Sequence, residues 1–186
     1  MARGRVIQGF LKSGERIVTY PIGDPATVSR VEHLQPPSDQ ADRLQYAQAG
    51  DTVDLVLSGI ELIRMSVGNI LANQNALPPI TKRFKARIIV MDTLTIPLIQ
   101  GAQVVFHMQS LDVPAVLKKL IATTTRSGEI KKERPRALTK GTTAIVEVLL
   151  SDKVCMEPYS DCRSMGRFVL RRAGDTVAIG IIEELL

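Results

Sequence analysis

The chain has few of the residues that bind metals or stack on nucleic-acid bases. It contains no Trp, 4% aromatic residues, two His and two Cys. With so few rings, extensive stacking on single-stranded bases is excluded, and phosphates are the expected contact if RNA is bound. Cys155 and Cys162 have no His near them in sequence, which argues against a tetrahedral metal site. We therefore expect no metal centre and two buried free thiols.

Catalytic motifs are also missing. No segment has the Gly-x-x-x-x-Gly-Lys-Ser/Thr order of a phosphate-binding loop, and Lys-Gly-Thr-Thr at residues 140–143 has the right composition in the wrong order. The two histidines form no Ser/His/Asp or Cys/His set. His107, between Phe106 and Met108, is expected to be packed, and His33 is expected on a surface loop. We predict that these residues do not form an enzyme.

Long apolar runs are absent. No run approaches the ~18 residues of a membrane helix, and the N-terminal Met-Ala-Arg-Gly-Arg has no signal-peptide core. We expect a soluble, cytoplasmic protein with neither membrane nor DNA as a partner. Residues 1–78 carry seven Lys and Arg against eight Asp and Glu, whereas residues 79–186 carry seventeen against eleven. The basic second half permits an anionic partner without requiring one.

What the chain does contain is a series of short β-branched segments separated by Gly, Pro, Asn and Asp, which is typical of all-β barrels. Residues 115–125 also fit helical spacing, but their Thr-rich end favours a strand. Asn-Gln-Asn-Ala-Leu-Pro-Pro at residues 73–79 continues neither element type, which predicts two domains, 1–76 and 80–186. The predicted strands span residues 5–8, 16–20, 27–32, 52–57, 69–72, 84–90, 103–109, 115–124, 143–150, 167–170 and 176–182.

The most informative motif is Gly-Arg-Phe-Val-Leu-Arg-Arg-Ala-Gly-Asp-Thr-Val-Ala-Ile-Gly at residues 166–180. Strand alternation sends Phe168 and Leu170 to one face, while Arg167, Val169 and Arg171 point to the other. Ala-Gly-Asp then supplies turn residues. Arginine on a strand recognises carboxylates well, so we favour partner contact by this second face over a merely solvated one.

This stretch resembles the closing hairpin of the third domain in translational GTPases of the elongation factor one-alpha and class-II release factor superfamily. Residues 4–15 resemble their second-domain hairpin, with glycines at positions 4, 9 and 14, and residues 49–71 match a later part of the same domain. The similarity spans nearly the whole chain. It implies two consecutive antiparallel β-barrels, equivalent to domains II and III of those factors.

Within this superfamily, Leu170, Arg171 and Gly174 resemble the release type rather than the elongation type. Gly-Ile-Glu-Leu-Ile-Arg at residues 59–64 looks more like the Hbs-one-like rescue GTPases, which partner Pelota, than like eukaryotic release factor three. Arg172 departs from the pattern, because an acidic residue usually follows the Leu-Arg pair. Family contacts that use that carboxylate are therefore in doubt here.

The resemblance implies a scaffolding role in ribosome rescue and messenger surveillance, including no-go decay. The second barrel would bind a Pelota-like release-factor paralogue, and the first would face the small ribosomal subunit. GTP and magnesium would belong to a preceding GTPase domain, so no cofactor is expected in these residues. The chain begins inside the second-domain hairpin, which predicts a first barrel without its first strand and a frayed edge or a strand-borrowing dimer.

The candidate site residues form two groups. The expected partner-binding residues are Arg167, Phe168, Arg171 and Arg172. The residues that could face ribosomal RNA or another anion are Lys131, Lys132, Arg134, Arg136, Lys12 and Arg16. For the basic hairpin at 126–140 we favour a solvated surface over an RNA contact.

Two other functions remain open. In termination or elongation, the same barrels would bind the class-I release factor or aminoacyl-tRNA. A member that had lost GTPase activity would instead link the ribosome to the RNA exosome, as some relatives do.

Overall fold

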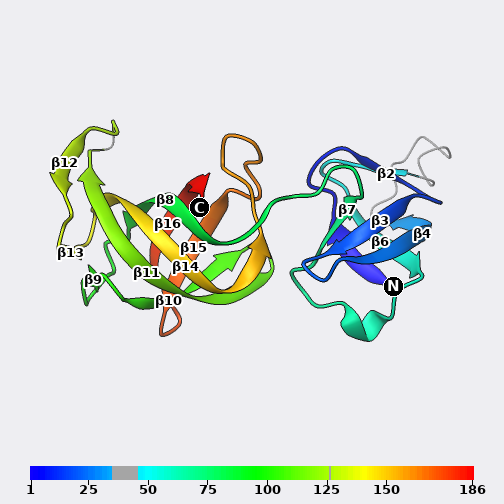
Figure 1. Cartoon of the computed structure of the whole chain (residues 1–186), viewed down its shortest axis with the longest axis horizontal. Helices are drawn as coiled ribbons and strands as arrows, with labels where there is room; N and C mark the ends of the chain where they lie inside the picture. Colours follow the sequence, from blue (N-terminus) through cyan, green and yellow to red (C-terminus); the bar gives the residue numbers. More distant parts are fainter. Residues whose placement is uncertain (35–45, 126) are drawn as a thin grey trace. The chain divides into compact units, whose positions relative to one another are not determined.

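The computed structural model describes residues 1–34, 46–125 and 127–186. They divide into two compact units, Met1–Leu77 and Pro78–Leu186, at the segment that the sequence marks as a connection (Figure 1). Every described element is a strand except the 3-10 turn η2 (Leu62–Arg64), so the all-β class is confirmed. Within the described residues, no helix has the length and apolar character needed to cross a membrane.

The first unit is built on a five-stranded antiparallel sheet with the order β1-β6-β4-β3-β7, and β2 pairs separately with β5. Its core is small, with Ile17, Val28, Val31 and Val53 among its buried residues. The strands are β1 (Ala2–Arg5), β2 (Phe10–Lys12), β3 (Arg16–Tyr20), β4 (Asp24–His33), β5 (Tyr46–Gln48), β6 (Thr52–Ser58) and β7 (Ile70–Asn73).

The start of the first unit differs from the prediction. The first strand is Ala2–Arg5, whereas residues 5–8 were expected to form it. Strand pairing with β6 stops at Arg5 and Thr52, and the chain then turns towards Gly9, whose φ is 74°. Arg3 holds β1 in place through two hydrogen bonds of 2.8 Å to the carboxylate of Asp54 on β6.

The sheet of the first unit has two end strands, since β1 pairs only with β6 and β7 only with β3 in the part of the chain that is described. Within those residues this sheet is open, because β1 and β7 do not pair with each other. His33 was expected on a loop but ends β4, where its Nε2 lies 2.9 Å from the carbonyl oxygen of Tyr46.

The second unit contains a closed antiparallel barrel. Six strands follow the order β10-β15-β16-β8-β14-β11, pairing of β10 with β11 closes the ring, and β12 extends from β11. A separate pair joins β9 to β13. The strands are β8 (Ile80–Val90), β9 (Leu98–Ile99), β10 (Gln103–Met108), β11 (Leu111–Thr124), β12 (Ile130–Glu133), β13 (Ala137–Leu138), β14 (Thr143–Cys155), β15 (Arg167–Arg172) and β16 (Asp175–Leu185).

The segment with ambiguous periodicity is a strand, β11, and its irregular pairing explains the ambiguity. The register with β14 shifts between Leu117 and Lys119 and again between Leu120 and Ala122. Because a bulge adds one residue to a strand, buried side chains on either side of it are three apart instead of two. Leu117 and Leu120 are both buried at that spacing, which imitates one turn of a helix.

The barrel core is centred on three aromatic rings. The ring centroids of Phe84 and Phe106, and of Phe84 and Phe168, lie 5.5 Å apart, and those of Phe106 and Phe168 lie 5.1 Å apart. Gly180 on β16 makes room for this cluster. A Cβ at Gly180 would lie 2.5 Å from Cζ of Phe168 and 2.9 Å from Cγ2 of Ile88, so any larger residue would displace the rings.

Candidate partner-binding face

The arginine strand β15 lies between β10 and β16 in the wall of the barrel. Its alternation is as predicted, because Phe168 and Leu170 are buried while Arg167 and Arg171 are exposed. The following turn is a two-residue hairpin, since Arg172 pairs with Asp175 and the two residues between them have φ values of 53° and 90°. Positive φ at both positions is the signature of a type I′ turn, which matches the twist of the strands.

The outward side chains of four neighbouring strands form an apolar row. His107 on β10 pairs with Val169 on β15, Val169 pairs with Ile179 on β16, and Ile179 pairs with Ile89 on β8. Directly paired residues in an antiparallel sheet have side chains about 5 Å apart. Ile89 and Ile179 are 48% and 43% exposed, so these aliphatic groups lie side by side on the outside of the barrel.

Arginines flank this row on both sides. Along one side, Arg167 pairs with Ile181 and Ile181 pairs with Arg87, while on the other side Arg171 pairs with Val105. A groove of about 460 Å³ runs over the face. We call this surface the partner face. It consists of Arg87, Ile89, Val105, His107, Arg167, Val169, Arg171, Ile179 and Ile181.

Arg167 is held in place by Tyr159, which lies in the loop before β15. The guanidinium donates a 2.8 Å hydrogen bond to the phenol oxygen and lies 5.1 Å from the ring centroid. This hydrogen bond, followed by the positive charge of Arg167, lowers the pKa of Tyr159. Gly166 permits the contact, because a Cβ there would lie 2.4 Å from Cα of Tyr159.

The other three predicted partner-binding residues have different surroundings. Arg171 is exposed and has no ion-pair partner among the described residues. Arg172 donates a 2.6 Å hydrogen bond to the carbonyl oxygen of Ile96, so it anchors the connection between β8 and β9. Phe168 is only 3% exposed and supports the face from beneath. Its side chain therefore has little surface to offer a partner, whereas the side chain of Arg171 is accessible.

Sequence reasoning missed most of the partner face, including Arg87, Ile89, Val105, His107 and Ile179. Only strand register brings these residues into one surface with the outward side chains of β15. One signal was available in the sequence, since Val-Ala-Ile-Gly-Ile-Ile at 177–182 is apolar at both odd and even positions. In a small barrel only one side of a strand faces the core, so a strand that is apolar on both sides indicates an outer surface suited to a partner.

His107 is half-buried and its Nδ1 is hydrogen-bonded to Oδ1 of Asp112, in agreement with a packed and satisfied histidine. Burial raises the pKa of the Cys155 thiol to about 11, so little reactive thiolate forms near neutral pH. Cys155 and Cys162 are buried and unpaired. Among the residues described, no three His, Cys, Asp or Glu side chains cluster where they could hold a metal ion.

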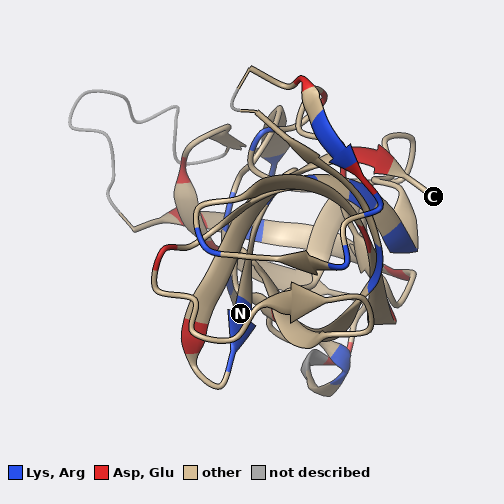
Figure 2. Ribbon diagram, turned by 90° about the vertical axis from the view of Figure 1, so that its left-hand side faces the viewer, with Lys and Arg blue, Asp and Glu red and all other residues tan. Residues whose placement is uncertain are grey.

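The predicted anion-facing residues are divided between the two units. Lys131 and Lys132 are exposed on β12, and Arg134 and Arg136 follow in the connection to β13. The other two residues belong to the first unit: Lys12, whose Nζ lies 5.3 Å from the Phe10 ring centroid, and the exposed Arg16. Basic and acidic segments are interspersed along the ribbon (Figure 2). Residue 126 of the predicted basic hairpin lies outside the described residues.

Comparison with known proteins places this architecture in one class, the C-terminal β-barrels of translation factors. Residues 83–183 match the family described as GTP-eEF1A C-terminal domain-like. The structure superposes on that of Sup35 complexed with GDP with a TM-score of 0.88 at 27% identity, covering 99% of this chain and 43% of that one.

Sequence relatives extend the match to both units. Protein HBS1 of Drosophila melanogaster is 39% identical over 183 residues, which is 98% of this chain and 26% of that protein. Elongation factor 1-alpha of Cenarchaeum symbiosum is 31% identical over 185 residues, 98% of this chain and 40% of that protein. The chain belongs to the GTP-eEF1A C-terminal domain-like family of translational GTPases. It spans between a quarter and two fifths of the length of these relatives.

Proposed function

We propose that this chain is the non-catalytic, partner-binding part of a translational GTPase of the Hbs-one-like rescue type. Its second barrel binds a Pelota-like release-factor paralogue through the partner face. The observation that carries the proposal is the apolar row of Val169, Ile179 and Ile89 bordered by Arg167 and Arg171. The 39% identity to Protein HBS1, against 31% to the elongation factor, favours the rescue type.

The chemistry of the partner face suits a protein partner better than RNA. Interfaces combine a desolvated apolar centre with a polar rim, and arginine is enriched in them. The row supplies that centre, and Arg171 supplies a planar donor for a carboxylate. Tyr159 holds the Arg167 guanidinium at 2.8 Å, so less side-chain entropy is lost when this residue binds.

In the whole protein, the two barrels act as a scaffold in the cytoplasm. GTP and magnesium are bound by a separate domain, because the Gly-x-x-x-x-Gly-Lys-Ser/Thr loop is not present in these residues. Lys12 and Arg16 in the first unit face ribosomal RNA phosphates of the small subunit. Delivery of the paralogue to a stalled ribosome then leads to rescue and messenger surveillance.

Calorimetric titration with purified Pelota, and separately with the class-I release factor, tests the proposal. Ile179→Asp places a charge in the middle of the row and should weaken Pelota binding more than tenfold, as expected for a central interface residue. Arg171→Ala should weaken it several-fold. Ile99→Asp is the matched control, because Ile99 is 54% exposed on β9 and does not line the groove of the partner face.

The outcomes separate the candidate functions. Selective Pelota binding that is lost in Ile179→Asp and kept in Ile99→Asp supports the rescue assignment. Preference for the class-I release factor moves the protein to termination, a role for which the structural likeness to Sup35 is the specific observation. Pelota binding that survives Ile179→Asp would show that the partner face is not the docking surface.

A further inference from the structure

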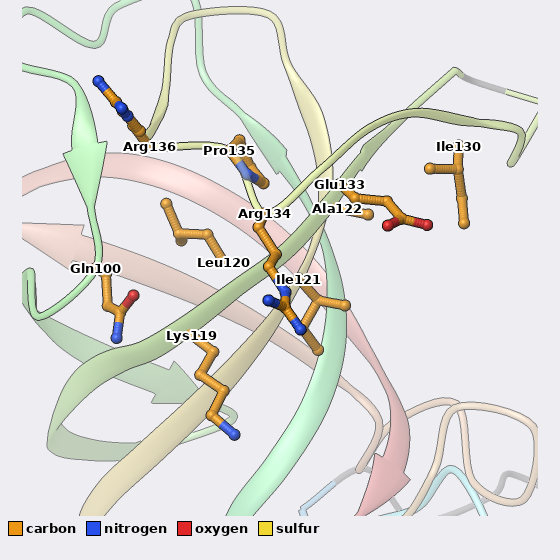
Figure 3. Close-up of a pocket in the computed structure, with 10 residues that line it drawn as sticks. All are labelled: Gln100, Lys119, Leu120, Ile121, Ala122, Ile130, Glu133, Arg134, Pro135 and Arg136. Carbon is orange, nitrogen blue, oxygen red and sulfur yellow. The ribbon is translucent and has the colours of Figure 1, made fainter.

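A second surface of the barrel, distinct from the partner face, has the form of a binding crevice. It lies between β11 and the chain that leaves β12, and its volume is about 710 Å³ (Figure 3). Volumes of this size are typical of ligand-binding pockets. Its lining comes from two stretches, Lys119–Ala122 and Glu133–Arg136, with Gln100 and Ile130 at the sides.

The shape of the crevice depends on an unusual bend at Arg134. Its φ is 45°, in the left-handed region that residues other than glycine rarely adopt. The bend is held by a 2.8 Å hydrogen bond from the Arg134 N–H to the carbonyl oxygen of Ile121 on β11, and the next residue, Pro135, is buried. This geometry keeps the chain close to β11 and directs the Arg134 side chain over the crevice (Figure 3).

Apolar groups form much of the lining. Ile121 is half-buried, Pro135 and Ala122 are buried, and Ile130 is 60% exposed at the side. Figure 3 places the Arg134 guanidinium beside Ile121, with the Lys119 side chain farther along β11. An occupant that covered Ile130 and Ile121 would gain burial of aliphatic carbon, which an ion alone cannot provide.

The charged groups of the crevice are mainly positive. The lining contains three cationic side chains, those of Lys119, Arg134 and Arg136, and one carboxylate, that of Glu133. The positive charge of Lys119 is partly neutralised by Glu147, because its Nζ lies 3.6 Å from Oε2 of that carboxylate. Among the described residues, neither Arg134 nor Arg136 has an ion-pair partner. Figure 3 shows the Arg134 guanidinium beside Ile121, whereas the Arg136 side chain is directed away from Ile121, beyond Pro135. Guanidiniums at the two ends of an apolar lining are complementary to carboxylates on either side of an aliphatic side chain.

We propose that this crevice binds a short protein segment in which acidic residues flank an aliphatic one. RNA fits the lining less well, because phosphodiesters cannot use Ile121, Ile130 and Pro135, and no aromatic ring lines the crevice for a base to stack on. The inference does not depend on Pelota binding, since none of the partner-face residues lines the crevice.

The test uses the whole 186-residue chain and a capped probe peptide of sequence Gly-Asp-Glu-Ile-Asp-Leu-Glu-Asp-Gly. Titration is followed by calorimetry and by backbone amide shifts in NMR spectra. We expect saturable binding, with the largest shifts in Lys119–Ala122 and Ile130–Arg136. An amide version of the peptide, with Asn and Gln in place of Asp and Glu, should bind at least tenfold more weakly, because its charges are removed.

Two double variants with the same change of charge decide whether the crevice itself is the site. Arg134→Asn/Arg136→Gln removes the crevice guanidiniums, and Asn tolerates the left-handed bend. Lys131→Gln/Lys132→Gln removes two exposed cations of β12 that do not line the crevice. The first pair should weaken peptide binding about tenfold, and the second less than twofold.

Four results would overturn the proposal. They are equal losses in the two double variants, equal binding of the amide peptide, no saturation at millimolar peptide, or largest shifts outside the crevice. A single-stranded RNA oligonucleotide that bound with the same crevice shifts, and more tightly than the peptide, would assign the crevice to RNA instead.

Discussion

Both units bury one face of an antiparallel sheet but, as far as the structure describes the chain, the sheet closes into a barrel only in the second unit. Among the described residues of the second unit, the core contains 24 buried residues, most of them on the six strands of the closed ring. The described part of the first unit has a core of seven buried residues on an open sheet with end strands β1 and β7. Buried apolar area is the main source of stability. The second unit should therefore unfold last, and the stability of the first unit should depend more on solution conditions.

Both candidate sites, the partner face and the crevice, belong to the second unit, whose sheet is closed. A closed barrel has no free sheet edges, so its outer surface can carry apolar and charged groups at fixed positions. The partner face lies on this wall, and β11 of the wall forms one side of the crevice. Function that depends on strand register, such as the row from His107 to Ile89, requires a sheet that does not slip.

The largest test of the comparison is truncation of the aromatic cluster. Phe84 is fully buried and its ring centroid lies 5.5 Å from those of Phe106 and Phe168. Phe84→Ala should lower the free energy of unfolding of the second unit by about 3–5 kcal/mol. Urea unfolding followed by NMR signals from each unit measures this. Equal loss of stability in the first unit would show that the two units unfold together.

A somewhat smaller effect is expected at Gly180, where the added Cβ would meet Phe168, Ile88 and the carbonyl oxygen of Arg87 within 3.0 Å. Gly180→Ala should destabilise the closed barrel by about 1–3 kcal/mol through overpacking. Gly4→Ala in β1 is the control, because no atom lies within 4 Å of its added Cβ. Thermal unfolding of the two variants gives the comparison, and a tolerated Gly180→Ala would mean that the aromatic cluster relaxes easily.

The buried carboxylate of Glu147 connects strands on the outside of the barrel. Its side chain is 5% exposed, and it accepts a 2.5 Å hydrogen bond from Arg83 Nε with Lys118 and Lys119 nearby. The bond to Arg83 lowers the pKa of Glu147 below its ordinary value of 4.5. Because Arg83 is 41% exposed and screened by solvent, Glu147→Gln should cost only about 1–2 kcal/mol at neutral pH.

The contribution of Glu147 to stability should depend on pH. A carboxyl group with a lowered pKa in the folded protein stabilises that state above the pKa of the unfolded chain, and this stabilisation is lost as the pH falls through the folded value. The gap in unfolding free energy between the native protein and Glu147→Gln should therefore shrink below about pH 4.5. Denaturant unfolding at pH 7 and pH 3.5 measures it, and a gap independent of pH would exclude the charge as its source.

The smallest effect concerns the open sheet. Unpaired edges favour association with another strand, so the chain should show weak, concentration-dependent self-association through β1 or β7. Amide signals of these two strands should shift with protein concentration, while those of β8 stay constant. The prediction would be contradicted if the chain sedimented as a monomer at all concentrations and the amides of both edges of β1 and β7 were protected from hydrogen exchange.

Much of the architecture could be predicted from the sequence, because strands and turns depend on local residue patterns. Alternation at 167–171 predicted which residues of β15 are buried, and the Ala-Gly-Asp turn predicted the hairpin. The errors also have local causes. The first strand ended earlier than expected because pairing with β6 stops at Arg5, and β11 imitated a helix because bulges displaced its buried positions.

The sequence by itself determined the all-β class, the connection near Leu77, the faces of β15 and the absence of a phosphate-binding loop, since each depends on residues close together in the chain. Only the tertiary structure decided that Ile89, Val169 and Ile179 form one row and that Arg134 bends over Ile121. The physical reason is that strand register and bulges are set by packing between distant segments. No local pattern records which strands will become neighbours.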